Sequence, residues 1–329
     1  MSRLVPLVVL LLLAAGVLAV APFVGQERIP VSALWDRNGG TNSLILWQLR
    51  LPRVAIAFLA GASLAVGGMT FQAVFRNPLA TPFTLGVASG ASLGAAIYIH
   101  LKLSLVLLGI PGISVFAFLG AAAAILVVYG LARLKRGFSS ATMLLAGVAV
   151  SFFFSSLILL LQYLGDFTQA YRILRWVMGG LDLGLGFGDA VGMLPLILAG
   201  TLIVVYHTHE LNLLSIGEEL AASRGVEVQR TKAAIFFAAS LLVGAVVAVC
   251  GPIGFVGLMA PHICRLVVGA DHRILAPATW LFGGAFLTTC DTAARTMLAP
   301  VELPVGILTA MLGGPFFLYL LLTRSVDEE

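Results

Sequence analysis

The sequence predicts an all-α protein that crosses a membrane about ten times. Of its 329 residues, 60 % are apolar and only 10 % are charged, whereas a soluble domain carries about 25 % charged residues. Apolar runs of about 20 residues, the length that spans a bilayer as a helix, recur along the chain. No alternation of polar and apolar residues indicates a membrane barrel. This composition excludes a water-soluble fold, a disulfide scaffold and a nucleic-acid-binding domain.

The charge-poor runs are predicted to be helices, because a helix satisfies its own backbone hydrogen bonds in lipid. They leave only short loops, so we expect one transmembrane domain over residues 1–329. The first run ends in Ala19-Val20-Ala21, which is typical of a signal-peptide cleavage site, but nine runs follow and we expect it to be retained. The expected spans are 4–24, 53–73, 84–101, 112–132, 141–163, 190–207, 232–250, 253–269, 275–297 and 304–322.

The distribution of basic residues predicts the orientation. With a cytoplasmic N-terminus, eleven of the 19 Lys and Arg residues lie in cytoplasmic loops, including Arg133, Lys135 and Arg136 in one short loop. Cytoplasmic loops of membrane proteins carry such an excess. An even number of spans then places the C-terminus in the cytoplasm as well.

A weak internal repeat favours a transporter. Residues 55–60 (AIAFLA) are similar to residues 234–239 (AIFFAA), and each follows basic residues. Five spans separate the two starts, so the copies would be inverted in the membrane. Inverted repeats are typical of transporters.

The longest polar stretch of the predicted cytoplasmic side runs from Leu211 to Arg230. Ser215 and Glu218 have the spacing of a capping box, and Gly225 is a suitable C-terminal stop. We therefore expect a helix of about two turns outside the membrane. Either it is a surface loop that happens to be helical, or it docks another protein.

A few polar residues fall in or beside the apolar runs. Asp291 and Arg295 are four residues apart and are expected to form an intramembrane ion pair, because an isolated charge in lipid is costly. Arg50 and Arg53 begin the second span, where basic residues commonly anchor a helix at the interface. The role of His262 stays open.

No motif for chemistry was found. None of the three lysines follows a glycine as in a phosphate-binding loop, so we expect no ATP hydrolysis and no enzyme activity. The histidines lack further ligands at metal-binding spacing, and we expect no metal site. The three cysteines lie inside apolar runs and are expected to pack as small hydrophobic residues; they are Cys250, Cys264 and Cys290.

Several longer motifs, in order along nearly the whole chain, resemble the FecCD-type permeases, which are membrane subunits of ABC importers for iron-siderophores, haem and cobalamin. The motifs are Leu49–Arg53, Gly67–Gln72, Asn77–Pro82, Gly86–Ala91, Arg175–Gly180, Gly254–His262, Asp271–Arg273, Asp291–Arg295 and Glu302–Gly306.

The resemblance implies a ten-helix subunit in the inner membrane that pairs with a second copy. It implies two further partners, a separate ATPase that holds ATP and Mg, and a periplasmic or lipid-anchored substrate-binding protein. Arg50, Arg53 and Arg295 would receive acidic residues of the binding protein. The ATPase coupling helix would comprise Glu218, Glu219, Leu220, Ala221, Ser223, Arg224 and Gly225. The cytoplasmic gates would be Asn77, Pro78, Leu79, Ala80, Ser139, Ser140, Ala141 and Thr142.

Two questions stay open at this point. The family commonly has Leu where this chain has Arg224, so the family's packing at that position is not carried over. We expect Arg224 to contact acidic residues of the ATPase instead. The sequence does not separate the candidate cargoes. The alternative function is an ion-coupled secondary transporter, which would need carboxylates near the middle of the membrane besides Asp291.

Overall fold

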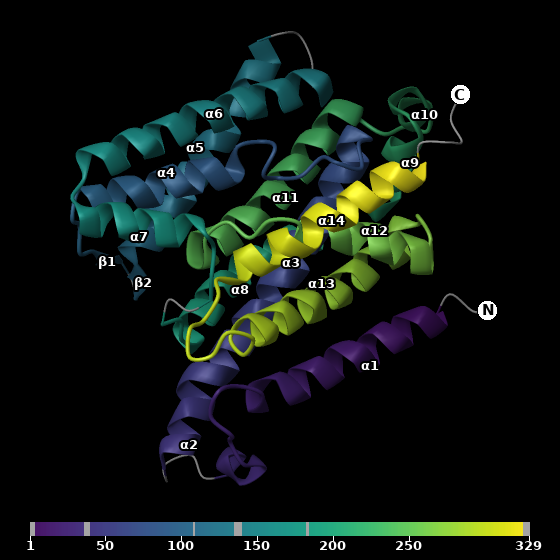
Figure 1. The fold of residues 1–329 in the computed structure, drawn as a ribbon. Coiled ribbons are helices and arrows are strands. Elements are labelled where there is room, and N and C mark those ends of the chain that lie inside the picture. The colour runs from purple at the N-terminus through teal and green to yellow at the C-terminus, as the bar shows by residue number, and fades with distance from the viewer. Residues whose placement is uncertain (1–3, 36–39, 108, 135–139, 182–183, 325–329) are drawn as a thin grey trace.

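The computed structural model describes residues 4–35, 40–107, 109–134, 140–181 and 184–324. Its long helices run side by side with a common inclination (Figure 1). They are α1 (Leu4–Val20), α3 (Leu51–Phe75), α4 (Val87–His100), α5 (Gly112–Leu134), α6 (Ser140–Leu164), α8 (Phe187–Tyr206), α11 (Val228–Cys250), α12 (Val256–Val268), α13 (His272–Ala294) and α14 (Val305–Arg324).

Short elements connect the long helices. They are η1 (Ala21–Phe23), η2 (Val31–Leu34), α2 (Thr41–Leu44), a π-helical segment (Ile45–Arg50), β1 (Val106–Leu107), β2 (Ile110–Pro111), α7 (Phe167–Val177), α9 (Thr208–Ile216) and α10 (Glu218–Ser223). The two strands form an antiparallel hairpin in which Val106 lies opposite Pro111. The all-α prediction is confirmed.

Each expected span corresponds to one long helix of the structure. In the described part of the chain, six helical stretches are long and apolar enough to cross a membrane by themselves, including α1, α5, α6, α8 and α11. The sixth is the continuous helical stretch Thr41–Phe75. Helices α4 and α12 are shorter apolar helices. The chain is a multi-pass membrane protein, and the count of ten stays a prediction.

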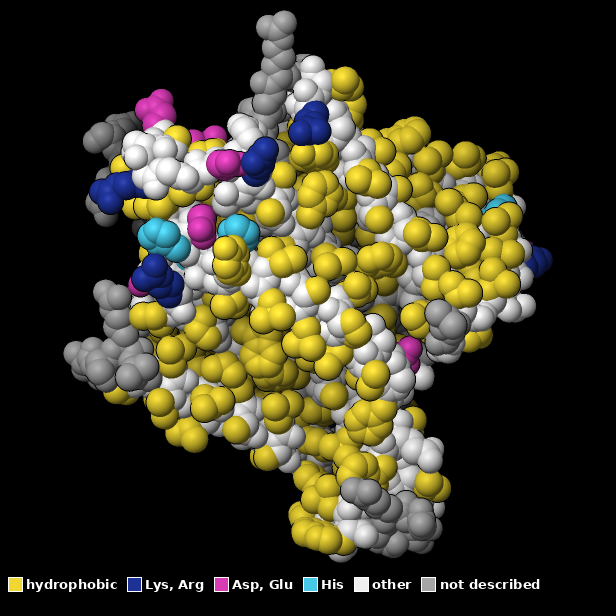
Figure 2. All heavy atoms as spheres, turned by 180° about the vertical axis from the view of Figure 1, so that it is seen from behind, with side chains coloured by type: hydrophobic (Ala, Val, Ile, Leu, Met, Phe, Trp, Pro, Cys, Tyr) yellow, Lys and Arg dark blue, Asp and Glu magenta, His cyan; other side chains and the backbone are white. Residues whose placement is uncertain are grey.

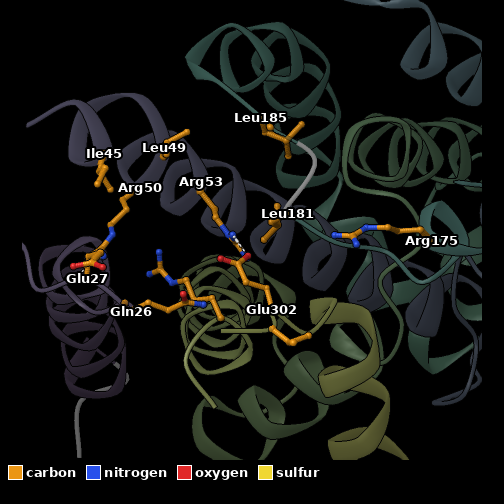
Figure 3. A pocket seen from close by; sticks show the side chains of 14 residues that line it. Gln26, Glu27, Ile45, Leu49, Arg50, Arg53, Arg175, Leu181, Leu185 and Glu302 are labelled. Atoms are coloured by element: carbon orange, nitrogen blue, oxygen red, sulfur yellow. Dashed lines mark hydrogen bonds and ion pairs between the residues drawn. The ribbon is translucent and has the colours of Figure 1, made fainter. Parts of the chain in front are cut away.

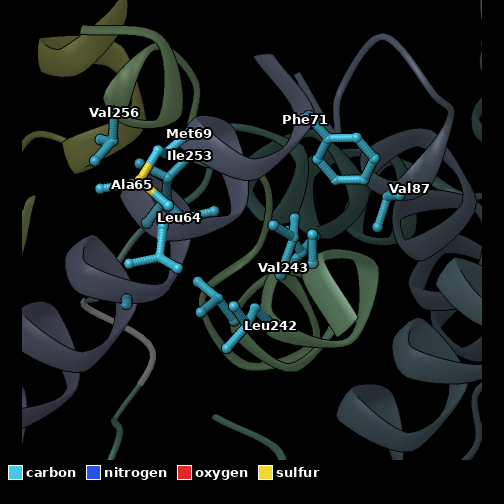
Figure 4. Packing of buried hydrophobic residues seen from close by; sticks show 14 of the residues in the cluster. Leu64, Ala65, Met69, Phe71, Val87, Leu242, Val243, Ile253 and Val256 are labelled. Carbon is cyan, nitrogen blue, oxygen red and sulfur yellow. The ribbon is translucent and has the colours of Figure 1, made fainter. Parts of the chain in front are cut away.

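Helix α3 lies at the centre of the bundle and packs against α11, α12 and α13. Leu64, Met69 and Phe71 of α3 meet Val243 of α11 and Val256 of α12 in the main hydrophobic cluster (Figure 4). Helices α3 and α11, which carry the two copies of the weak repeat, run in opposite directions (Figure 1). That arrangement agrees with an inverted repeat, which itself stays a prediction.

Glycines allow α3 to approach its neighbours at backbone distance. A Cβ atom on Gly61 would collide with the carbonyl oxygen of Gly283 in α13, and one on Gly68 would collide with the backbone of Gly257 in α12. Small residues permit such close contact between membrane helices, where dispersion forces replace the hydrophobic effect. These two crossings fix α3, α12 and α13 to one another.

Hydrophobic side chains cover much of the face shown in Figure 2. Helix α6 exposes Leu145, Phe152, Phe153 and Leu159, as expected for a surface that faces lipid. Charged and histidine side chains gather at one end of this face. That end carries α9 and α10 and lies near the start of α1 and the end of α14 (Figure 1); we call it the hairpin end.

Candidate functional site

A cavity of about 560 Å³ whose lining includes four arginines lies at the other end of the molecule, which we call the arginine end (Figure 3). It is bounded by the α1–α2 connection, the π-helical segment, the start of α3, the end of α7, the α7–α8 connection and the α13–α14 connection. The lining residues are Gly25, Gln26, Glu27, Ile45, Leu49, Arg50, Arg53, Arg175, Leu181, Gly184, Leu185, Arg295, Val301 and Glu302. The three arginines predicted to receive a binding protein are therefore brought together.

Arg53 binds the carboxylates of both Asp291 and Glu302 beside the cavity. Its Nε lies 3.0 Å from Oδ2 of Asp291, its Nη2 lies 2.9 Å from Oδ1 of the same residue, and its Nη1 lies 2.7 Å from Oε2 of Glu302. The Asp291 side chain is 1 % exposed, while that of Glu302 is 37 % exposed. This two-point contact between guanidinium and carboxylate fixes the start of α3 to α13.

Arg50 and Arg295 bind backbone carbonyls of the segment that follows α1. Arg50 donates to the carbonyl oxygens of Pro22 and Glu27, at 3.2 and 2.6 Å. Arg295 donates to the carbonyl oxygen of Ala21 at 2.6 Å. The two guanidinium groups therefore hold the chain where it turns away from α1. Both arginines are almost fully buried, at 7 % and 4 % exposure.

The expected ion pair between Asp291 and Arg295 is wrong. Asp291 binds Arg53, and no salt bridge joins it to Arg295 within the described residues. The spacing of four residues places Asp291 and Arg295 on one helix face, but a guanidinium from α3 approaches the carboxylate with better geometry. Arg295 binds the backbone of η1 instead, and it also donates to Oγ1 of Thr292.

Helix α7 positions Arg175 at the cavity. A capping box between Asp166 and Gln169 begins this helix, and Nζ of Lys102 lies 3.2 Å from Oδ2 of Asp166. The backbone N–H of Gln169 and the Lys102 ammonium lower the pKa of the Asp166 carboxyl below its usual range. Arg175 is exposed near the end of α7, where it borders the cavity.

The hairpin end contains the predicted coupling helix. Helix α10 starts at Glu218, and Gly225, with φ of +84°, reverses the chain after it. The exposed residues of this segment are Glu219, Leu220, Ala222, Ser223, Arg224 and Gly225, whereas Ala221 is buried. The segment thus presents one outward surface while its other side is seated on the bundle.

The predicted capping box at α10 is wrong. Ser215 belongs to the preceding helix α9, and its hydroxyl donates to the carbonyl oxygen of Asn212. Glu218 binds Nζ of Lys232 at 2.9 Å instead, and the Lys232 side chain is fully buried. Because a lysine from α11 lies within reach, the carboxylate pairs with an ammonium rather than with a backbone amide.

The two predicted gate segments are described in part. Asn77 accepts a hydrogen bond from the backbone N–H of Leu79 at 2.9 Å, and Pro78 and Leu79 are exposed while Ala80 is buried. This tight turn follows the left-handed residue that ends α3. Ser140, Ala141 and Thr142 begin α6, and Ser139 lies outside the described residues.

Sequence reasoning missed the partners of the predicted site residues. Glu302, Glu27 and Arg175 border the arginine cavity, and Lys232 holds α10. Glu302 and Arg175 stand in the motifs that carry the family resemblance, so the motifs contained a usable signal. Glu27 and Lys232 lie outside those motifs, and only the folded arrangement identifies them.

Comparisons with known proteins decide the family. A model of the FecCD transport family matches residues 8–323. This chain belongs to the FecCD transport family. It is therefore a membrane permease, a transport subunit, as the sequence predicted.

Named relatives of this permease share its full length or most of it. It is 38 % identical to the hemin transport system permease HmuU of Yersinia pestis, over 98 % of this chain and 96 % of the relative. It is 42 % identical to the cobalamin import permease BtuC of Halobacterium salinarum, over 87 % of this chain and 75 % of that one. It is 39 % identical to the Fe(3+)-citrate import permease YfmD of Bacillus subtilis, over 87 % and 83 %.

A solved structure is similar in fold over nearly the whole permease. This structure is described as an inward-facing conformation of a metal-chelate type ABC transporter. The TM-score is 0.85 at 31 % identity, and the match covers 96 % of this chain and 98 % of the other.

Proposed function

We propose that this permease forms the membrane pathway of a binding-protein-dependent ABC importer that carries a bulky metal chelate. The match to the FecCD family over residues 8–323 carries the proposal, and relatives named for hemin, cobalamin and ferric citrate support the cargo class. A second copy would complete the pathway, a separate ATPase would bind ATP and Mg, and one transmembrane domain would comprise residues 1–329. Among the chelates, we favour an iron complex.

In the proposed orientation the hairpin end faces the cytoplasm of a bacterial cell and the arginine end faces the periplasm. Both chain ends would then be cytoplasmic. The exposed surface of α10 would contact the ATPase, and Arg224 would meet acidic residues there. Nucleotide can bias the two states of the permease only through contacts that differ between those states.

The gates Asn77–Ala80 and Ser139–Thr142 would close the pathway at the cytoplasmic side. The tight turn at Asn77 supports this assignment, because its exposed Pro78 and Leu79 stand free of the bundle. The gate assignment is part of the proposal.

The test is transport by the complete importer in proteoliposomes. The permease is reconstituted with its ATPase and a binding protein loaded with haem, cobalamin or a ferric siderophore. We expect uptake of one class of chelate that requires both ATP and the binding protein. Uptake driven by an ion gradient without the ATPase would contradict the proposal and favour a secondary transporter.

The arginine cavity is the proposed docking region for the binding protein, and the structure refines how it would act. Arg50 and Arg295 already bind backbone carbonyls of the segment after α1. Of the three arginines, Arg53 is therefore the best placed to receive an acidic side chain, because its partner Glu302 is partly exposed. Glu302 occupies that position in the free permease. A docking carboxylate would have to displace it.

Glu302→Gln is therefore expected to tighten docking several-fold, because one carboxylate no longer competes for Nη1 of Arg53. Exposed ion pairs contribute about 0.2–1 kcal/mol, so the change is modest and high salt should reduce it. The measurement is the Kd for the binding protein at low and high salt. Gln26→Glu, which adds a carboxylate at the cavity rim, is the matched control and should weaken docking. Unchanged affinity in both variants would place docking elsewhere.

A further inference from the structure

Polar side chains tie the α9–α10 hairpin to two helices of the bundle. Nδ1 of His209 on α9 lies 3.2 Å from Nη2 of Arg273 on α13, and two stronger contacts accompany it. Glu218 of α10 binds the fully buried ammonium of Lys232 on α11. Asn212 of α9 binds the start of α13. The two contacts lie on different helices, so the hairpin is fixed with respect to both α11 and α13.

The contact of Asn212 uses both atoms of its amide. The side-chain NH2 donates to Oδ1 of Asp271 at 2.8 Å. The amide oxygen accepts the backbone N–H of His272 at 2.8 Å, and it lies 2.7 Å from Nδ1 of the same residue. An amide oxygen only accepts, so the hydrogen lies on Nδ1 of His272. Three short hydrogen bonds therefore converge on one side chain.

The same carboxylate begins α13. Oδ1 of Asp271 accepts the backbone N–H of Arg273 and thereby caps the helix. His272 is nearly fully buried. Asn212 thus holds the cap residue and the first residue of a membrane helix at the same time, through directional bonds with little freedom to slide. At its far end α13 carries Asp291, which binds Arg53 at the arginine cavity.

We propose that Asn212 is a positioning residue that passes the movement of the ATPase-bound hairpin to α13. This inference rests on the proposed function, in which α10 docks the ATPase. Motion of the hairpin then displaces the start of α13, and α13 carries it to the cavity where the binding protein docks. Lys232 and Glu218 keep the hairpin seated, while Asn212 connects it to the helix that spans both ends.

The test exchanges donor and acceptor across the contact. Asn212→Asp removes the NH2 donor and sets a carboxylate against that of Asp271, while still accepting from His272. Asp271→Asn, added to the first change, restores a donor opposite an acceptor and keeps a good helix cap. Ser215→Ala is the control on the same helix, because that hydroxyl is exposed and binds only the carbonyl of Asn212.

The readout is cargo transported per ATP hydrolysed in proteoliposomes, together with the amount of ATPase that co-purifies. We expect Asn212→Asp to lower transport per ATP about tenfold, the scale of a typical coupling free energy, with ATPase binding unchanged. The double variant should recover most of the loss, and Ser215→Ala should match the wild type.

Three results would overturn the inference. They are full transport per ATP in Asn212→Asp, a loss that Asp271→Asn does not rescue, and a loss of ATPase co-purification, which would make Asn212 part of the docking surface only. A wild-type complex without ATP-driven uptake would overturn the proposed function itself. Uptake by the wild-type complex is therefore measured before any variant is compared.

Discussion

A permease carrying Leu220→Asp and Ala222→Asp is expected to lose its ATPase. Both side chains are exposed on the outward surface of α10, where the docking proposal requires a partner. A carboxylate buried at an interface without a counter-charge costs several kcal/mol, and each 1.4 kcal/mol corresponds to about tenfold in affinity. We expect co-purified ATPase to fall at least tenfold. Glu218 is left in place, so the contact with Lys232 is kept.

The matched control places two carboxylates at the opposite end of the molecule. Val106→Asp and Leu107→Asp change exposed residues of β1, and ATPase should co-purify as in the wild type. Deletion of Glu218–Arg224 should also abolish binding, but it removes the carboxylate that Lys232 binds and is the less specific variant. Normal complex formation by the α10 variant would place ATPase docking elsewhere.

Asp291→Ala is expected to have the largest effect on stability. It leaves Arg53 nearly buried with Glu302 as its remaining carboxylate partner among those described. Removal of one partner of a buried ion pair typically costs about 3–5 kcal/mol. The thermal midpoint of the permease in detergent should fall by several degrees, and uptake should fall with it.

Two variants control for this result. Glu302→Gln removes the half-exposed partner and should lower the midpoint far less, since exposed pairs contribute about 0.2–1 kcal/mol. Arg53→Met combined with Asp291→Leu replaces both charges and should be milder than Asp291→Ala, because no buried charge is left without its partner. Glu302 loses Arg53 in this variant, but its side chain is 37 % exposed. If Asp291→Ala melted as Glu302→Gln does, the central role of this pair would be refuted.

The sequence predicted the helices well because lipid imposes a simple rule on apolar runs. The range 112–132 became α5, and 141–163 became α6, each within two residues of the predicted limits. The polar contacts were harder to predict. Spacing along one helix suggested that Asp291 binds Arg295, but the partner is Arg53, which is 238 residues away. Likewise, Ser215 and Glu218 have capping spacing, but Lys232 on another helix takes the carboxylate.

The same limit applies to the candidate site. The resemblance brought Arg50, Arg53 and Arg295 to attention, and the structure places them together at one cavity. The resemblance could not tell that two of the three bind the segment after α1, because local sequence does not record which backbone carbonyls come within reach of a side chain in the folded protein. The docking role of these arginines stays a prediction.

The glycine crossings have a consequence for how the permease changes state. Helix α3 touches α12 and α13 backbone to backbone, at Gly68 and Gly61, and such interlocked surfaces do not slide gradually. We therefore expect these three helices to move together as one rigid body. Alternation between open sides would then take place at the boundary between that body and the peripheral helices. A bulkier residue at either crossing would then shift all three helices rather than one.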